Sequence, residues 1–151
     1  MLIPLLAACA FHATGLVEPV RNEVILKTYE GERWVLVLGE DGKPVRYLDD
    51  ATVAVDGRRL GKRVFVRDWW VADAGDGSSG FVGVVRRWGA RLVIDDRNTK
   101  TTLGLDDVSS AKLWELDGKP VLVQGHVVGG GIVEVMRWRV LEEGADGWYA
   151  R

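Results

Sequence analysis

The chain contains two similar copies of one unit, and this repeat constrains the fold more than any other feature of the sequence. Residues 48–57 align without a gap with residues 116–125, which lie 68 positions further on. Residues 63–71 align with residues 132–140 at an offset of 69, and an extra glycine in the run Gly129–Gly131 accounts for the added position. A duplicated unit of this size predicts two small modules with the same fold.

A second match upstream predicts how the two copies differ. Residues 24–36 align with residues 82–94 at an offset of 58, so the first copy is ten residues shorter before its next strand. In the second copy, capping residues at Asp106-Asp107 precede good helix formers, which predicts a helix near residues 107–116. Because the first copy lacks ten residues at this point, we expect no helix there.

The composition is typical of small β modules, and the net charge argues against one class of function. With 151 residues the chain can form one domain or two of about 50–60 residues, and such small units are expected to pack together. Nineteen Gly, seven Trp and abundant Val favour strands joined by tight turns. A net charge of −2 argues against a general nucleic-acid binder, and a single Cys excludes an internal disulfide.

The order of the predicted elements in the second copy is β-β-β-α-β-β. Val108, Leu113 and Leu116 share one face of the predicted helix. A helix between the third and fourth strands resembles the OB-fold, a five-stranded Greek-key barrel. The resemblance implies an all-β, mostly antiparallel fold class: two tandem small OB-like barrels, the second with a short helix. The strands are expected at Phe81–Arg87, Arg91–Asp95, Lys100–Leu105, Val121–Val128 and Ile132–Leu141.

The body of the chain is therefore divided into two modules. In the first, we expect a hairpin of residues 23–30 and 33–38, a short strand at 45–48, and strands at 52–56 and 62–72. The expected boundaries are residues 23–73 for module 1, residues 74–80 for the linker, residues 81–142 for module 2 and residues 143–151 for a C-terminal tail.

The N-terminal run Leu6-Ala7-Ala8-Cys9 resembles the lipobox of bacterial lipoproteins, in which an apolar residue and two small residues precede a lipid-modified cysteine. The cysteine thiol carries the diacylglyceryl group as a thioether, and small residues allow the peptidase to thread the backbone. The resemblance implies that residues 1–8 are a signal remnant and that residues 9–22 are a tether between the lipid on Cys9 and the body. Ala10, and not an aspartate, follows the cysteine. In enterobacterial lipoproteins this resembles the pattern that directs sorting to the outer membrane.

The signal segment departs from the usual pattern, which leaves an alternative. Secretory signals have about 15–30 residues and a positive start, whereas only residues 1–8, none of them charged, precede Cys9. We therefore expect the true start to lie upstream. The alternative is a cytosolic protein in which residues 1–11 form a buried apolar strand.

A basic stretch beside aromatic residues is the best candidate for a binding site. It follows Gly57, in the predicted loop between the last two strands of module 1, a loop with which OB-folds hold ligands. Cations beside aromatic rings suit phosphates, stacked bases or sugars. The alternative is a solvated hairpin neutralised by Asp56 and Asp68. The candidate residues are Arg58, Arg59, Lys62, Arg63, Arg67 and Trp70.

Two further patterns refine this site. Side chains two positions apart share a face of a strand, so Arg63 and Arg67 are expected on the same side. The second copy has His126 followed by Val and Gly residues at the equivalent place, so the basic loop is not a property of the module itself.

No set of residues suggests catalysis or a resident metal. His12 and His126 have no obvious nucleophile or ligand partner nearby in the sequence. Asp73–Ser78 lacks the spacing of a calcium loop. The paired carboxylates fall at turns or at a helix start, where Asp bonds local backbone amides; they are Asp49-Asp50, Asp95-Asp96 and Asp106-Asp107. We expect no catalytic residue, no metal and no cofactor.

These observations predict a non-enzymatic lipoprotein of the bacterial cell envelope with a binding or scaffolding role. The lipid on Cys9 would hold it on the periplasmic face of a membrane. Its expected partners are that membrane and an anionic envelope ligand or a protein. The rival interpretation is a cytoplasmic OB-type protein that binds single-stranded nucleic acid. That function needs a basic, aromatic groove, which the second copy does not obviously supply.

Overall fold

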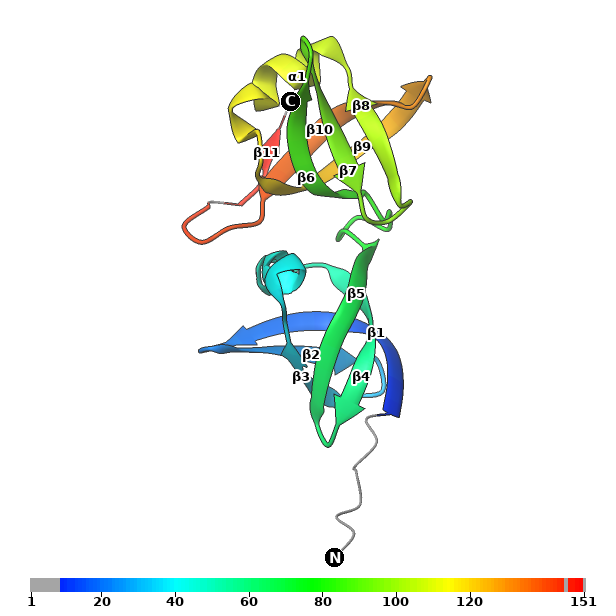
Figure 1. Cartoon of the computed structure of the whole chain (residues 1–151), viewed down its shortest axis with the longest axis vertical. Coiled ribbons are helices and arrows are strands. Elements are labelled where there is room, and N and C mark those ends of the chain that lie inside the picture. Colours follow the sequence, from blue (N-terminus) through cyan, green and yellow to red (C-terminus); the bar gives the residue numbers. More distant parts are fainter. Residues whose placement is uncertain (1–8, 146, 151) are drawn as a thin grey trace, which may run out of the picture. The chain divides into compact units, whose positions relative to one another are not determined.

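The computed structural model describes residues 9–145 and 147–150. The chain divides after Trp69 into two units, and a small β barrel forms in each (Figure 1). The predicted fold class, two tandem OB-like barrels with a short helix in the second, is confirmed. The predicted signal remnant, residues 1–8, lies outside the described residues.

Five strands close the first barrel in the order β1-β2-β3-β5-β4, with β4 pairing back onto β1. The β1–β2, β2–β3 and β1–β4 pairs are antiparallel, whereas β3 and β5 are parallel. The elements are β1 (Cys9–Val20), β2 (Glu23–Thr28), β3 (Arg33–Val37), the 3-10 helix η1 (Glu40–Tyr47), β4 (Thr52–Leu60) and β5 (Arg63–Asp73).

The second barrel repeats this connectivity. Its strand order is β10-β8-β7-β6-β9, the β9–β10 pairing closes the ring, and β8 and β10 are the parallel pair. A short strand, β11, pairs with Arg137 and Trp138 of β10, beyond the residues of β10 that pair with β8. The elements are β6 (Phe81–Trp88), β7 (Arg91–Asp96), β8 (Thr101–Leu105), α1 (Asp107–Leu113), the 3-10 helix η2 (Trp114–Leu116), β9 (Pro120–Gly129), β10 (Ile132–Val140) and β11 (Tyr149–Ala150).

Each barrel is filled by aliphatic side chains that alternate along its strands. Burying one such side chain stabilises the fold by about 1.5–3 kcal/mol, so each small barrel depends on its own set. The first barrel buries Val17, Leu26, Leu36, Val53, Val55 and Val64, and the second buries Val85, Leu92, Ile94, Leu105, Val121 and Val133.

Residues 9–20, which the sequence assigned to a tether, form strand β1 of the first barrel, so that assignment was wrong. β1 pairs with β2 on one side and with β4 on the other, and it is therefore required to close the barrel. Its buried residues include Gly15 and Val17, and its exposed residues include Leu16. Buried and exposed residues do alternate along β1. The sequence does not show this alternation, because a glycine is buried and an apolar leucine is exposed. The first module begins at Cys9 rather than at residue 23.

The strand pairing also corrects the upstream part of the repeat. The match of residues 24–36 with residues 82–94 was wrong, because it placed β2 and β3 on β6 and β7. In the structure β1 and β2 correspond to β6 and β7, and each paired position recurs 68 residues further on. Three such equivalent positions are Gly15 and Gly83, Thr28 and Asp96, and Val53 and Val121.

The wrong alignment explains the predicted absence of a helix in the first module. The 3-10 helix η1 lies between the third and fourth strands, the place that α1 occupies in the second barrel. The short strand expected at residues 45–48 is instead the end of η1, where Val45 and Leu48 are fully buried. The Trp69 indole Nε1 donates to the carbonyl of Asp41 at 2.8 Å and holds η1 on the barrel.

Helix α1 forms where the sequence predicts a helix, although its buried face differs. Asp106 is the N-cap, and its carboxylate accepts from the Ser109 amide at 2.9 Å. Val108 is 46% exposed instead of sharing a buried face with Leu113. Ser109 and Ser110 are buried in its place, because their hydroxyls accept hydrogen bonds from the backbone amides of Val135 and Leu92.

The segment between β5 and β6 contains two local turns built on carboxylates. Asp73 Oδ1 accepts from the amides of Gly75 and Gly77 at 2.7 and 3.0 Å. Asp76 Oδ1 accepts from the hydroxyl and the amide of Ser78, and these hydrogen bonds lower the pKa of Asp76. Both aspartates therefore have local structural roles.

Candidate binding surface

The β4–β5 hairpin carries the basic residues that the sequence singled out. The chain reverses at Gly61, whose φ of 61° lies in the left-handed region that favours glycine. All five basic residues are exposed, and two exposed apolar residues, Leu60 and Phe65, lie among them. We call this set the hairpin surface: Arg58, Arg59, Leu60, Lys62, Arg63, Phe65 and Arg67.

Strand β5 presents one face of this surface to solvent. Arg63, Phe65 and Arg67 are exposed, whereas Val64 between them is fully buried. Alternate residues of a strand point to opposite faces, so the two arginines flank Phe65 on the outer side. The prediction that Arg63 and Arg67 share a face is confirmed. The sixth predicted residue, Trp70, is half-buried, lies beyond the end of the first unit and is not part of the hairpin surface.

The carboxylates expected to neutralise this hairpin have other bonds. Asp56 accepts from Nδ1 of His12, its partner across the β1–β4 pair, at 2.5 Å. Asp68 Oδ1 accepts from the Trp69 amide at 2.9 Å. Within residues 9–145 and 147–150, Arg58, Arg63 and Arg67 take part in no ion pair. Their charges are left to solvent or to a ligand.

Arg59 and Lys62 differ from the other three cations because they pack on an aromatic ring. The Arg59 guanidinium and the Lys62 ammonium lie 5.3 and 4.5 Å from the ring centre of Trp34. Phe11 packs edge-on against the same indole at 4.8 Å. Trp34 is thereby only 5% exposed. Its ring orders two cations and is not available to stack on a ligand.

The first strand brings Cys9 beside this hairpin. Cys9 is exposed and is the first residue of β1, where its partner on β4 is Arg59. Ala10 is likewise opposite Arg58. Cys9 and Arg59, fifty positions apart in the sequence, are therefore direct neighbours. The sequence did not reveal this because residues 9–20 were not recognised as a strand.

A smaller and a larger hollow in the described part of the chain adjoin β1. The smaller, of about 510 Å³, is lined by Ala10, Phe11, His12, Asp56, Gly57 and Arg67, and so reaches the edge of the hairpin surface. The larger, of about 980 Å³, lies between the first half of β1 and the β2–β3 turn, and Glu30 and Glu32 line it. The acidic rim of the larger hollow makes the hairpin the better place for an anion.

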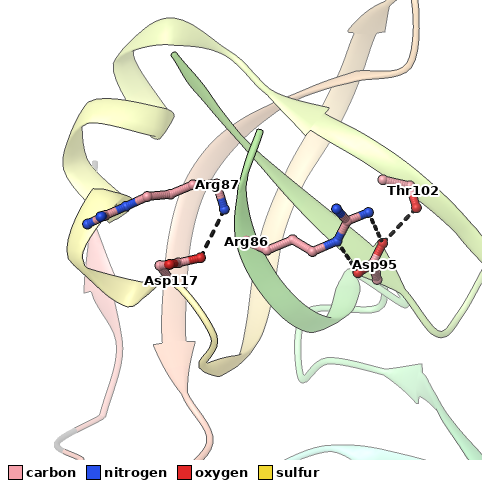
Figure 2. A network of polar contacts seen from close by, with 5 residues as sticks. All are labelled: Arg86, Arg87, Asp95, Thr102 and Asp117. Carbon is pink, nitrogen blue, oxygen red and sulfur yellow. Dashed lines mark hydrogen bonds and ion pairs between the residues drawn. The ribbon is translucent and has the colours of Figure 1, made fainter. Parts of the chain in front are cut away.

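In the second barrel, polar side chains of neighbouring strands form hydrogen bonds and ion pairs with one another. Figure 2 shows Arg86 of β6 extended across Asp95 of β7, with Thr102 of β8 on the far side of the carboxylate. Arg86 Nε and Nη2 donate to the two carboxylate oxygens at 2.7 and 3.2 Å, and Thr102 Oγ1 donates at 2.6 Å. The hydrogen bonds from Arg86 have the largest effect on the pKa of Asp95, which they lower, and the hydrogen bond from Thr102 lowers it further. The hydrogen bonds to Asp95 raise the pKa of Arg86.

Neighbouring polar groups of this barrel are also held locally. Asp117 accepts from the Arg87 amide at 2.9 Å (Figure 2), and the Arg87 guanidinium lies 4.6 Å from the ring centre of Trp114. Asp96 is 2% exposed and accepts from the Val82 amide and the Thr99 hydroxyl. These charges are engaged in holding strands and turns together.

Comparison with protein-family models, with curated proteins and with solved structures finds no match for this chain. The described residues contain no group of three or more His, Cys, Asp and Glu side chains that could hold a metal ion. No helix in the described part of the chain is both long and apolar enough to span a bilayer.

Proposed function

We propose that this protein is a non-enzymatic lipoprotein of the bacterial cell envelope, anchored through Cys9, whose first barrel binds an anionic partner on the hairpin surface. The observation that carries the binding role is the absence of any ion pair at Arg58, Arg63 and Arg67 within residues 9–145 and 147–150. Several cations elsewhere already contact a carboxylate or a ring, namely Arg33, Lys43, Arg86, Arg87, Arg91, Lys119 and Arg137. An anion at this hairpin would supply the missing counter-charge.

The anchor is supported by the lipobox-like run Leu6-Ala7-Ala8-Cys9 and by the exposure of the Cys9 thiol. A thiol at the outer end of a strand leaves room for a bulky thioether, because its side chain is not part of the barrel core. A lipid at Cys9 would hold the first barrel directly at the membrane surface, with β1 in place of a tether.

The non-enzymatic role is supported by what the carboxylates and imidazoles contact. His12 bonds Asp56, and His126 lies 3.9 Å from Glu134 on the neighbouring strand. Asp95 and Asp96 accept several hydrogen bonds each. Threonine hydroxyls, of Thr102 and of Thr99, are among the donors to these two aspartates, so each carboxylate is held by structural partners.

Single-stranded nucleic-acid binding is less well supported, because that function uses exposed aromatic rings on which bases stack. Trp34, the ring nearest to the cations, is covered by Arg59, Lys62 and Phe11. Phe65 alone offers an open ring within the hairpin surface. We therefore treat nucleic acid as the competing outcome of the binding test.

The anchor is tested by detergent partitioning of the protein expressed in a bacterium with its full native leader. The native protein is expected in the detergent phase with an acylated Cys9 by mass spectrometry, and the Cys9→Ala variant in the aqueous phase. Equal partitioning of the two proteins would exclude the lipid anchor.

A further inference from the structure

We infer that the anionic partner of the hairpin surface is the headgroup layer of the membrane itself. The inference rests on the proposed function for two points, that the hairpin surface binds an anion and that a membrane lies at Cys9. The hairpin would thus be a second membrane contact, formed by side chains, next to the covalent lipid.

The first step is the distance between Cys9 and the cations. Cys9 is paired with Arg59, and Ala10 with Arg58. Directly opposed residues of an antiparallel pair have Cα atoms about 4.5–5.5 Å apart. Charges interact effectively within about 8 Å at physiological ionic strength. A lipid on Cys9 therefore brings its own headgroup layer within reach of the hairpin without any movement of the barrel.

The second step is the chemistry of the hairpin. Leu60 at its tip and Phe65 on its outer face are each 45% exposed, although both are large apolar side chains. They lie among arginines and a lysine whose long apolar stems can lie along the membrane boundary with the charge at the headgroups. Mixed basic and apolar residues are typical of surfaces that bind anionic lipid.

The third step is the contrast with the second barrel, which provides an internal control. Its β9–β10 hairpin has His126 and Val127 where the first has Arg58 and Arg59. Glu134 replaces Phe65, and Met136 replaces Arg67. The fold tolerates a hairpin without Lys or Arg at these positions. Exposed apolar residues occur in both hairpins, since Val127, Val128 and Met136 are exposed in the second, whereas the basic residues are specific to the barrel that begins at Cys9.

The test uses the full chain with Cys9→Ser, produced without lipid, so that membrane binding reports the hairpin alone. Binding is measured by co-sedimentation with vesicles of phosphatidylcholine, with and without phosphatidylglycerol. We expect binding only where phosphatidylglycerol is present, weakening steeply as salt is raised. Each basic residue at an anionic surface contributes about five-fold to binding, so changing Arg58, Arg63 and Arg67 to Ser should weaken it by about 100-fold.

A charge-matched control separates the hairpin from net charge. Changing Lys43, Arg91 and Lys112 to Ser removes three exposed cations from η1, β7 and α1. This control should bind phosphatidylglycerol vesicles within a few-fold of the parent. Equal losses in the two triple variants would overturn the inference, as would equal binding to the two kinds of vesicle.

A second pair of changes distinguishes a membrane from a soluble anion. Leu60→Ser with Phe65→Ser should weaken vesicle binding at high as well as low salt, because apolar insertion is not screened. The same pair should leave binding to a soluble polyphosphate unchanged. If an oligothymidylate binds more tightly than the vesicles do, the surface is a nucleic-acid site instead. The two tests are independent. A negative partition test would exclude the lipid anchor without changing the vesicle result, and a negative vesicle test would not exclude the lipid anchor.

Discussion

The β4–β5 and β9–β10 hairpins occupy the same place in two barrels of the same connectivity, yet they present different chemistry. The equivalence is shown by Gly57 and Gly125, each of which lies so close to the opposite strand that a Cβ would meet a carbonyl oxygen, of Phe65 or of Glu134, at 2.1 and 2.2 Å. The first hairpin has five cations, and the second has glycines and valines. The backbone positions are thus set by close packing, whereas the exposed side chains are free to specialise.

The largest expected effect tests the shared backbone. A Cβ on Gly15 or Gly83 would lie 2.3 or 1.9 Å from a backbone oxygen of the neighbouring strand. Gly15→Ala and Gly83→Ala should each destabilise the protein by about 2–4 kcal/mol, measured by chemical denaturation. Gly39→Ala, with open space around it, is the control and should stay within about ±0.5 kcal/mol. If Gly83→Ala lowered the stability much less than Gly15→Ala, the two glycines would not have equivalent roles in the two barrels.

The next effect tests whether the hairpin alone decides binding. Introducing Arg at His126, Val127 and Met136, all exposed, gives the second hairpin cations equivalent to Arg58, Arg59 and Arg67. In a background with the first hairpin neutralised, this change should restore at least ten-fold of the lost binding to phosphatidylglycerol vesicles, measured by co-sedimentation. No recovery would mean that the first barrel contributes more than its hairpin charges.

A smaller effect separates the two kinds of cation within the first hairpin. Arg59→Ser with Lys62→Ser should cost about 1–2 kcal/mol of stability and raise the accessibility of Trp34 to a fluorescence quencher, because both cations cover its ring. Arg58→Ser with Arg63→Ser should change stability by no more than about 0.5 kcal/mol. Identical stability of the two double variants would show that the ring contacts contribute nothing.

The smallest expected effect is on how the stability of the second barrel depends on pH. The pKa of Asp95 is lowered in the folded state by Arg86 and Thr102. Its contribution to stability is therefore present above the ordinary pKa of an aspartate and is lost as pH falls through the lower folded value. Arg86→Met should raise the pKa of Asp95 in an NMR titration and flatten that part of the stability profile. Lys27 is at the equivalent position of the first barrel, so no matching step is expected there.

The sequence predicted the architecture because the apolar pattern of β4, β5, β9 and β10 repeats almost unchanged. β1 was missed because Gly15 is required where three strands come close together and Leu16 faces outward, so neither obeys the simple alternation. Because β1 was omitted, the alignment of the two copies was shifted by one strand, and no helical segment was expected where η1 lies. One missed strand thus produced three errors.

The candidate site was predicted in its residues but not in its arrangement. The cluster of cations is visible in the sequence, and Arg63 and Arg67 follow the strand period. The role of Trp34 depends on β3 lying parallel to β5, and the position of Cys9 depends on β1 pairing with β4. Both are contacts between distant segments, and local patterns contain no information about them.

The place of β1 in the barrel has a consequence for any form of the protein shortened at its N-terminus. Removal of residues 9–20 would take away the strand that joins β2 to β4. Two strand edges with unpaired amides and carbonyls would then face solvent, and such edges pair readily with other chains. A shortened protein is expected to self-associate through these edges, so its aggregation would report a lost strand and not an intrinsically sticky domain.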